Sequence, residues 1–198
     1  LNILAMFDGQ ILTDSLAEKI MGEIIRYGLY RPMKQTETVK MKWANTPKGE
    51  FANQLLSDQE VWEMLKNNPQ DHKEAGFKKG WPSRFATSFD YAKELGFVYY
   101  WPNQLITFSK VGLRLANTIE VNIDSDNTIT VNVVHPEFEQ QAFLHALAKS
   151  QRNNPFVRVL NENVPFVLLL QVIEKLNKDP EFNNCGLTRL ELPLIIFW

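Results

Sequence analysis

Ser83-Arg-Phe-Ala-Thr-Ser-Phe-Asp-Tyr-Ala-Lys-Glu-Leu-Gly96 is the stretch of sequence that decides how this chain is expected to fold. Its apolar residues Phe85, Phe89 and Ala92 recur at the spacing of an α-helix, so they share one side of it. Glycine is common just past a helix C-terminus. The stretch therefore predicts a helix that begins at Ser83, finishes at Leu95-Gly96 and packs its apolar side inward.

A short β-hairpin and a further helix are expected directly after this stretch. Two runs rich in strand-forming residues, Phe97 to Trp101 and Leu105 to Phe108, are separated by Pro-Asn-Gln. Ser109 then has the residue type favoured at a helix N-cap, and it opens a predicted helix through Leu115.

Two more helices are expected upstream of it. Residues Thr13 to Tyr27 carry apolar side chains at helical spacing, and Ser57 with Glu60 forms a capping-box pattern that opens a helix closing near Asn68-Pro69. Residues 31 to 56 are polar and basic and predict a loop, with at most a short element around Phe51 to Leu56. Helix, helix, helix, hairpin, helix is the order of a winged helix-turn-helix.

The C-terminal part predicts a second hairpin and the start of another module. Strict alternation around Asp-Asn indicates a hairpin of Ile119 to Asp124 with Thr128 to Val134, and Pro136 starts a helix. An Asn163-capped helix through Leu176 and a Thr188 to Glu191 capping box follow. The expected class is α+β, mainly helical, with three parts: a winged-helix DNA-recognition module at 1–118, a hairpin and connecting helix at 119–150, and the truncated start of a second winged-helix-like module at 151–198.

Composition describes an ordinary globular chain. The 198 residues are 44% hydrophobic with a net charge of −2, and no apolar run approaches the ~20 residues of a membrane-spanning helix. The single cysteine, Cys185, and the absence of a signal-peptide pattern favour the cytoplasm. Because the chain begins at Leu1 and stops in an apolar run, we expect it to be a fragment.

No catalytic or metal-binding pattern is recognisable in the sequence. The three histidines and one cysteine are scattered, and neither a phosphate-binding loop nor a nucleophile elbow occurs. The only Asp-x-Lys, Asp71 to Lys73, falls in a predicted loop, whereas nucleases of the restriction type carry that motif on a strand. Asp124-Ser-Asp126-Asn resembles the start of a calcium loop but lacks the later glycine and glutamate, which favours a turn. We therefore expect no catalytic residue, metal or cofactor in this segment.

Basic and polar side chains suggest a surface for double-stranded DNA. Arg84, Thr87 and Tyr91 share the side of the predicted helix opposite Phe85, where an arginine can pair with guanine in a major groove. Residues 26 to 48 contain six basic side chains and one acidic one. The candidate DNA contacts are Lys40, Lys42, Lys48, Lys78, Lys79, Ser83, Arg84, Thr87, Ser88, Tyr91, Asn103 and Gln104. A solvated helix beside an ordinary basic loop is the alternative interpretation.

The order and spacing of these motifs resemble a known family. The run Arg84 to Tyr100, the run Leu105 to Ala116, and the segments Asn154 to Phe156, Pro165 to Leu168 and Gly186 to Pro193 are similar to the recognition region of AlwI-type and FokI-like type IIS restriction endonucleases. The resemblance covers most of the chain from residue 81 onward. A looser match lies at residues 28 to 30, and residues 119 to 134 have no counterpart.

This resemblance implies a protein that reads a short asymmetric DNA site through tandem winged helices. Cleavage would be carried out by a separate magnesium-dependent nuclease domain outside these residues, so the segment itself would read DNA without cutting it. Two alternatives stay open: a winged-helix transcription regulator, and a winged-helix module that binds another protein through Tyr99, Tyr100 and Trp101.

Overall fold

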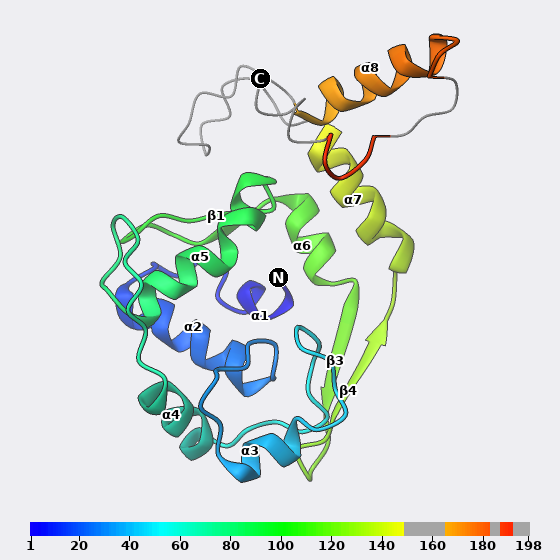
Figure 1. Ribbon diagram of the computed structural model, residues 1–198. Helices are drawn as coiled ribbons and strands as arrows, with labels where there is room; N and C mark the ends of the chain where they lie inside the picture. The colour runs from blue at the N-terminus through cyan, green and yellow to red at the C-terminus, as the bar shows by residue number, and fades with distance from the viewer. Residues whose placement is uncertain (149–164, 183–186, 192–198) are drawn as a thin grey trace. The chain divides into compact units, whose positions relative to one another are not determined.

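The computed structural model describes residues 1–148, 165–182 and 187–191 (Figure 1). These residues form an α+β structure, mainly helical, with two antiparallel two-stranded sheets. The chain divides into two compact units, Leu1–Gln140 and Gln141–Trp198. None of the helices in the described residues has the length and apolarity needed to cross a membrane.

The first unit contains most of the regular structure. Its helices are α1 (Asn2–Ala5), α2 (Asp14–Arg26), α3 (Glu37–Lys42), α4 (Asp58–Asn67), α5 (Trp81–Glu94) and α6 (Lys110–Ala116). Its strands are β1 (Val98–Tyr99), β2 (Thr107–Phe108), β3 (Ile119–Ile123) and β4 (Ile129–Val133), and α7 (Pro136–Ala148) begins in this unit.

Three of the predicted helices begin at the capping residues that the sequence indicated. The hydroxyl of Thr13 accepts a hydrogen bond from the Leu16 amide at the start of α2, and Ser57 and Glu60 form a complete capping box on α4. The hydroxyl of Ser109 accepts from the Gly112 amide at the start of α6. These caps satisfy amide groups that a helix leaves without a partner in its first turn.

The helix that contains Phe85 and Phe89 begins earlier than predicted. Helix α5 starts at Trp81 rather than at Ser83, with Pro82 in its first turn, where a missing amide hydrogen costs nothing. Its N-cap is Gly80, whose φ of 113° belongs to a region that glycine enters readily. Ser83 is therefore an interior residue of the helix and not its cap.

Two short helices were missed. The structure places α3 within residues 31 to 56, which the sequence predicted to be a loop, and it places α1 at the N-terminus. Thr36 caps α3 by accepting a hydrogen bond from the amide of Val39, the only residue of that helix that is buried. A helix of six residues with one buried side chain is too short to show a helical repeat of apolar residues in the sequence. The short element expected at Phe51 to Leu56 contributes only an isolated bridge between Gln54 and Thr128.

The core of the first unit forms where α2 packs against α4 and α5 (Figure 1). Phe85 is fully buried at its centre. The ring of Phe85 lies 5.0 Å from that of Phe89, 5.1 Å from that of Tyr100 and 6.1 Å from that of Phe77, measured between centroids. Helix α5 is thereby joined through one aromatic cluster to the hairpin after it and the loop before it.

Strands β1 and β2 form the predicted hairpin, and a third segment runs beside it. Val98 pairs with Phe108, and Tyr99 pairs with Thr107. Residues 9 to 12, which precede α2, form backbone hydrogen bonds of 2.8 to 2.9 Å with residues 103 to 106 in an antiparallel sense. The chain between β1 and β2 is therefore anchored to the segment that leads into α2.

Strands β3 and β4 form the second predicted hairpin, with Ile119 opposite Val133 and Ile123 opposite Ile129. Its turn is closed by a hydrogen bond from the Asn127 amide to the Asp124 carbonyl, so the predicted turn is confirmed. Backbone bonds also link the hairpin to residues 53 and 55. The hairpin is thus part of the first unit. The sequence had predicted that it belongs to a separate connecting part, residues 119–150.

The second unit contains α8 (Pro165–Lys178). This agrees with the predicted helix, whereas its expected cap, Asn163, lies outside the described residues. Residues 187 to 191 form a turn in which the amide and hydroxyl of Thr188 both donate to Glu191 at 2.7 Å. The remainder of the helix expected there also lies outside the described residues.

Candidate nucleic-acid interface

Helix α5 has one buried and one exposed side, as the sequence predicted. Phe85 and Phe89 are buried, whereas Tyr91 is 57% exposed and both Thr87 and Ser88 are exposed. Arg84 is half-buried on the exposed side. Because residues three and seven apart lie above one another on a helix, Arg84, Thr87 and Tyr91 form a row along its surface.

The hydroxyl of Thr87 is used within the protein. It lies 2.7 Å from Nε2 of His72 and donates to the carbonyl of Ser83 at 3.2 Å. The same Nε2 lies 2.9 Å from a Glu74 carboxylate oxygen. In a catalytic triad the acid and the nucleophile contact different nitrogens of the histidine. Here both contact one nitrogen, so the arrangement holds the loop on α5 and is no triad.

Ser83 is not available to a ligand, which corrects the sequence-based assignment. Its side chain is fully buried, and its hydroxyl accepts from the Glu74 amide at 3.0 Å and donates to the Lys78 carbonyl at 2.8 Å. The residue closes the loop of residues 70 to 80 onto α5. A small polar residue at this position could be a DNA contact or a residue that holds the loop, and only the tertiary structure distinguishes these two roles.

The hairpin is held on α5 by a lysine that sequence reasoning missed. Lys93 is buried, forms a 2.7 Å ion pair with Asp90, and places its ammonium 4.9 Å from the ring centres of both Tyr100 and Trp101. Tyr100 and Trp101 follow Lys93 by seven and eight residues across a change from helix to hairpin, so no helical or strand spacing indicates the contact. The contact fixes the hairpin relative to the exposed side of the helix.

Only part of the expected aromatic hairpin tip is exposed. Tyr100 is a core residue whose hydroxyl donates to the carbonyl of Ala86 at 3.1 Å, and burial raises its pKa well above the ordinary range. Trp101 is partly exposed, and the side chains of Asn103 and Gln104 face solvent. The polar residues at the turn are therefore accessible, whereas Tyr100 is not.

The loop before α5 carries two exposed lysines. Lys78 and Lys79 face solvent, and Lys79 forms a 2.6 Å ion pair with Asp71, an exposed pairing that contributes little stability. The loop also contacts the hairpin, since a Cβ on Gly76 would lie 2.8 Å from Pro102. The loop before α5 thus lies directly beside the hairpin turn at Pro102.

Charge changes sign along α5. The lysines before it and Arg84 are basic, and its first turn carries no acidic residue. Asp90 and Glu94 lie in its second half. Because the N-terminal end of a helix also carries a partial positive charge, the first half of α5 is the part that favours an anion.

The basic stretch of residues 26 to 48 is not a free basic patch. Arg26 pairs with Glu23 and Asp58, and Arg31 donates to the backbone carbonyls of residues 28, 43 and 46. Lys40 pairs with Glu37 at 2.6 Å and Lys42 with Glu60 at 2.7 Å. Of the three lysines proposed there as phosphate contacts, only Lys48 is exposed and forms no ion pair within the described residues. Figure 1 shows α3 at the opposite end of the unit from the β1–β2 hairpin.

Lys42→Met is expected to change stability in a pH-dependent way. Burial raises the pKa of Glu60, but the hydrogen bonds from Lys42 and Ser57 outweigh it and hold that pKa below its ordinary value of 4.5. The stabilisation is therefore present above about pH 4.5 and lost as pH falls through the lowered pKa. Urea unfolding at pH 7 should show a loss of about 1 kcal/mol for Lys42→Met and a smaller loss at pH 3. Lys40→Met, which removes an exposed pair, is the control, and an equal loss at both pH values for Lys42→Met contradicts the assignment.

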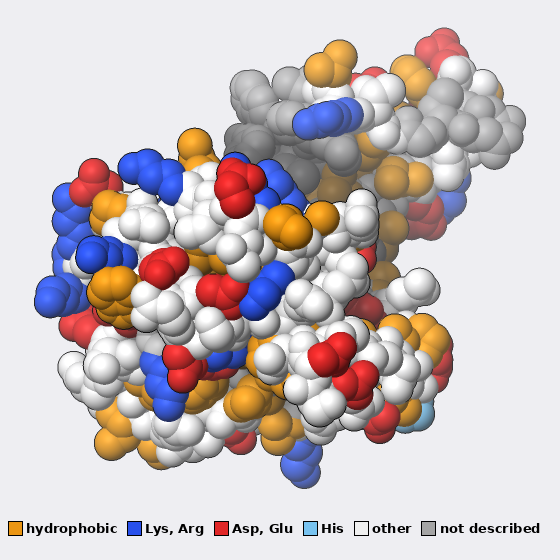
Figure 2. All heavy atoms as spheres, turned by 90° about the horizontal axis from the view of Figure 1, so that it is seen from below, with side chains coloured by type: hydrophobic (Ala, Val, Ile, Leu, Met, Phe, Trp, Pro, Cys, Tyr) orange, Lys and Arg blue, Asp and Glu red, His pale blue; other side chains and the backbone are white. Residues whose placement is uncertain are grey.

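The charge is mixed on one face of the molecule. Figure 2 shows basic and acidic side chains side by side on the face seen from below, with no continuous basic area. A protein that binds nucleic acid through charge alone has a broad basic face. On this face, any binding of nucleic acid must therefore depend on the placement of a few groups.

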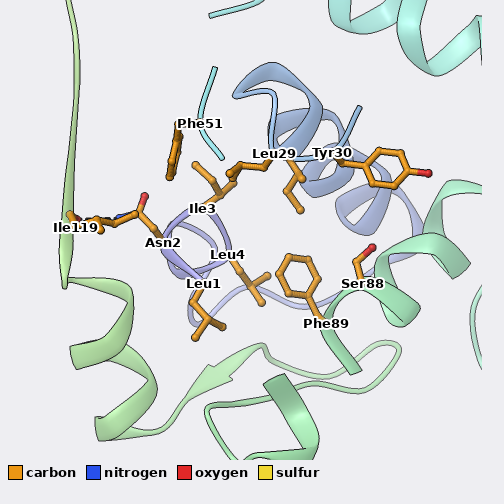
Figure 3. A pocket seen from close by; sticks show the side chains of 11 residues that line it. Leu1, Asn2, Ile3, Leu4, Leu29, Tyr30, Phe51, Ser88, Phe89 and Ile119 are labelled. Carbon is orange, nitrogen blue, oxygen red and sulfur yellow. Dashed lines mark hydrogen bonds between the residues drawn. The ribbon is translucent and has the colours of Figure 1, made fainter. Parts of the chain in front are cut away.

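A pocket of about 310 Å³ opens beside α5 (Figure 3). Its walls are mostly apolar and include Leu4, Leu29, Phe51 and Phe89. Asn2 lies in the lining, but its amide nitrogen is committed to the carbonyls of Ala116 and Ile119. None of the eleven lining side chains is a carboxylate, histidine, cysteine or lysine, and Tyr30 is the ionisable side chain among them.

The described residues contain no group of three or more histidine, cysteine, aspartate or glutamate side chains placed to hold a metal ion. No family model, curated protein or solved structure matches the chain. The geometry around α5 is therefore the main guide to what the molecule does.

Proposed function

We propose that this chain binds duplex DNA in a sequence-dependent manner, with α5 entering the major groove. The observation that carries the proposal is the row of Arg84, Thr87 and Tyr91 on the exposed side of a helix whose other side is locked into the core. A rigid helix with such a row can present side chains to base edges.

The surroundings of α5 support the same proposal. The arrangement of α2, α5 and the β1–β2 hairpin, with residues 9 to 12 as a third extended segment beside the hairpin, suits a winged helix-turn-helix. In such folds the N-terminal residues of the recognition helix contact bases, and the first half of α5 is its basic half. Lys78 and Lys79 would contact phosphates, and Asn103 with Gln104 would reach the DNA from the wing.

The place of this chain in a larger protein is part of the proposal. Its resemblance to AlwI-type and FokI-like type IIS restriction endonucleases supports a role as the site-reading part of such an enzyme, with a magnesium-dependent nuclease domain outside these residues. The flanking sequence of the parent gene tests this directly. An acidic residue followed by Asp/Glu-x-Lys on adjacent predicted strands supports the endonuclease, and their absence contradicts it.

A salt titration tests DNA binding itself. Binding of the chain to a labelled duplex of mixed sequence, followed by fluorescence anisotropy, should weaken as salt rises because counterions are released from the phosphates. Binding that is absent at low salt, or that does not depend on salt, overturns the proposal and favours a protein-binding role for the exposed aromatic residues.

Arg84→Ala is expected to weaken binding to a preferred site by about 1–3 kcal/mol while changing binding to random duplex little. The reason is that a pairing with guanine is lost only where that guanine is present. Lys79→Ala provides the comparison, since loss of a phosphate contact lowers affinity for every duplex alike. Equal losses on preferred and random duplexes for Arg84→Ala would show that Arg84 contacts a phosphate.

A further inference from the structure

Arg84 is held by a side chain that the sequence did not single out. Its Nε donates a 3.0 Å hydrogen bond to Oε1 of Gln70, which lies in the loop between α4 and α5. Within the described residues, Nη1 and Nη2 of Arg84 make no hydrogen bond or ion pair. One edge of the guanidinium is therefore occupied and its end is presented outward.

Gln70 is itself fixed in orientation. Its amide nitrogen Nε2 donates to the carbonyl of Asn68 at 2.8 Å. Because the nitrogen is used there, the oxygen is the atom that faces Arg84. An oxygen acceptor is what the Nε–H of arginine requires, so both contacts of the amide agree in donor and acceptor character.

Asn68, which accepts the hydrogen bond from Gln70, is a buried residue. It is the C-cap residue of α4 and is only 8% exposed. Its side chain accepts from the Lys34 amide at 2.8 Å and donates to the carbonyls of Lys34 and Met64 at 2.8 and 2.9 Å. A continuous series of hydrogen bonds thus runs from a buried asparagine through Gln70 to Arg84.

A guanidinium held in one orientation suits guanine, whose acceptors have fixed positions on the base edge. Guanine presents two acceptors, O6 and N7, which arginine meets with a pair of parallel donors. A phosphate can also accept two parallel donors from arginine, but every nucleotide carries one, so a guanidinium fixed on a phosphate gives no base preference. The hydrogen bond to Gln70 uses the Nε–H donor of Arg84 and leaves Nη1 and Nη2 as an oriented pair of donors.

We propose that Gln70 is a positioning residue that presents Nη1 and Nη2 of Arg84 end-on to one guanine of the bound duplex. The inference rests on the proposed function, since it assumes that α5 lies in the major groove. It assigns to the loop before α5 a role in specificity, in addition to any contact of its lysines with phosphates.

The test compares base preference among variants of the whole 198-residue chain. Wild-type protein first selects duplexes from a random pool, and affinities are then measured on the selected duplex and on copies in which each G·C pair is replaced by A·T. Arg84→Ala should abolish the preference at one guanine. Gln70→Leu should reduce the preference at that same guanine by about 2- to 10-fold, because a freed arginine must be ordered on binding.

Two further variants separate positioning from general damage. Gln70→Glu keeps the acceptor and adds charge attraction to Arg84, which offsets the loss of the donor to the Asn68 carbonyl. It should therefore retain the guanine preference while lowering affinity for all duplexes by charge repulsion. Gln59→Leu replaces an exposed glutamine of α4 and should change nothing. A second readout needs no DNA: the Nε–H proton of Arg84 should exchange with water faster in Gln70→Leu than in wild type, as followed by NMR.

The possible results separate the two proposals. If wild type enriches a sequence but Gln70→Leu keeps the full preference at every guanine, or loses affinity uniformly, the role of Gln70 is overturned while DNA recognition stands. Equal proton exchange in wild type and Gln70→Leu also overturns it. If wild type enriches no sequence, both the role of Gln70 and the proposed function fail.

Discussion

Replacing Gly112 with alanine is expected to lower the free energy of unfolding by about 3 kcal/mol or more. A Cβ at this position would lie 1.8 Å from the carbonyl oxygen of Phe97 and 2.7 Å from its carbon. Both are backbone atoms, so no side-chain rotation relieves the clash. Helix α6 would have to move away from the end of α5 and the start of the hairpin, which also breaks the 3.1 Å bond from the Ser109 amide to the Phe97 carbonyl.

Gly22→Ala is the matched control, because it makes the same substitution inside another helix. A Cβ on Gly22 would lie 3.4 Å from Val61 and 3.6 Å from Leu65, which are ordinary contacts with side chains. Alanine is also the better helix former by about 1 kcal/mol, so this variant should be as stable as wild type or more stable. Urea unfolding of both variants measures the difference. Similar stabilities for the two would contradict the close approach of α6 to Phe97.

Phe85→Ala is expected to cost about 3–5 kcal/mol, the usual range for removing a buried phenylalanine. Phe85 is fully buried, and its ring contacts three other aromatic rings that come from α5, the loop before it and the hairpin after it. The cavity would loosen all three segments together. The midpoint of thermal unfolding should therefore fall. DNA binding should be lost at temperatures at which the variant is unfolded.

Tyr91→Ala removes an aromatic ring from the opposite side of the same helix and serves as the control. Since Tyr91 is mostly exposed, its loss should change the free energy of unfolding by no more than about 0.5 kcal/mol. Any effect on DNA binding would then occur in a folded protein. A comparable loss of stability in the two variants would mean that the assignment of core and ligand sides of α5 is incorrect.

Local features of the fold were predictable from sequence because the interactions that define them are local. Thr13, Ser57 and Ser109 each lie three residues from the amide that they cap, so the pattern alone locates the helix start. The two hairpins likewise followed from runs of strand-forming residues and their turns. The two sides of α5 were predictable because helical spacing separates Phe85 from Tyr91.

The features that sequence reasoning missed depend on partners whose spacing in the chain follows no helical or strand pattern. Ser83 has the residue type of a cap or a DNA contact, and only its bonds to Glu74 and Lys78 show that it closes a loop. Lys42 looked like a free cation until Glu60, eighteen residues later, was placed beside it. Gln70 meets Arg84 across a loop that has no periodic pattern. Residue type gives the chemistry of such groups, whereas tertiary packing decides whether they are available.

Mixed surface charge has a consequence for any DNA complex. With few unpaired lysines near α5 and acidic side chains in its second half, the attraction to phosphates should be modest. Affinity would then depend more on base contacts than it does in strongly basic proteins. The preference for a particular sequence should therefore be a large part of the total binding.

The most direct measurement is selection from a random pool of duplex DNA by the 198-residue chain, followed by sequencing of the bound fraction. DNA recognition through α5 predicts enrichment of one short motif with a guanine that is no longer preferred when Arg84→Ala is used. A bound fraction with the same composition as the starting pool, or a motif unchanged by Arg84→Ala, would contradict it.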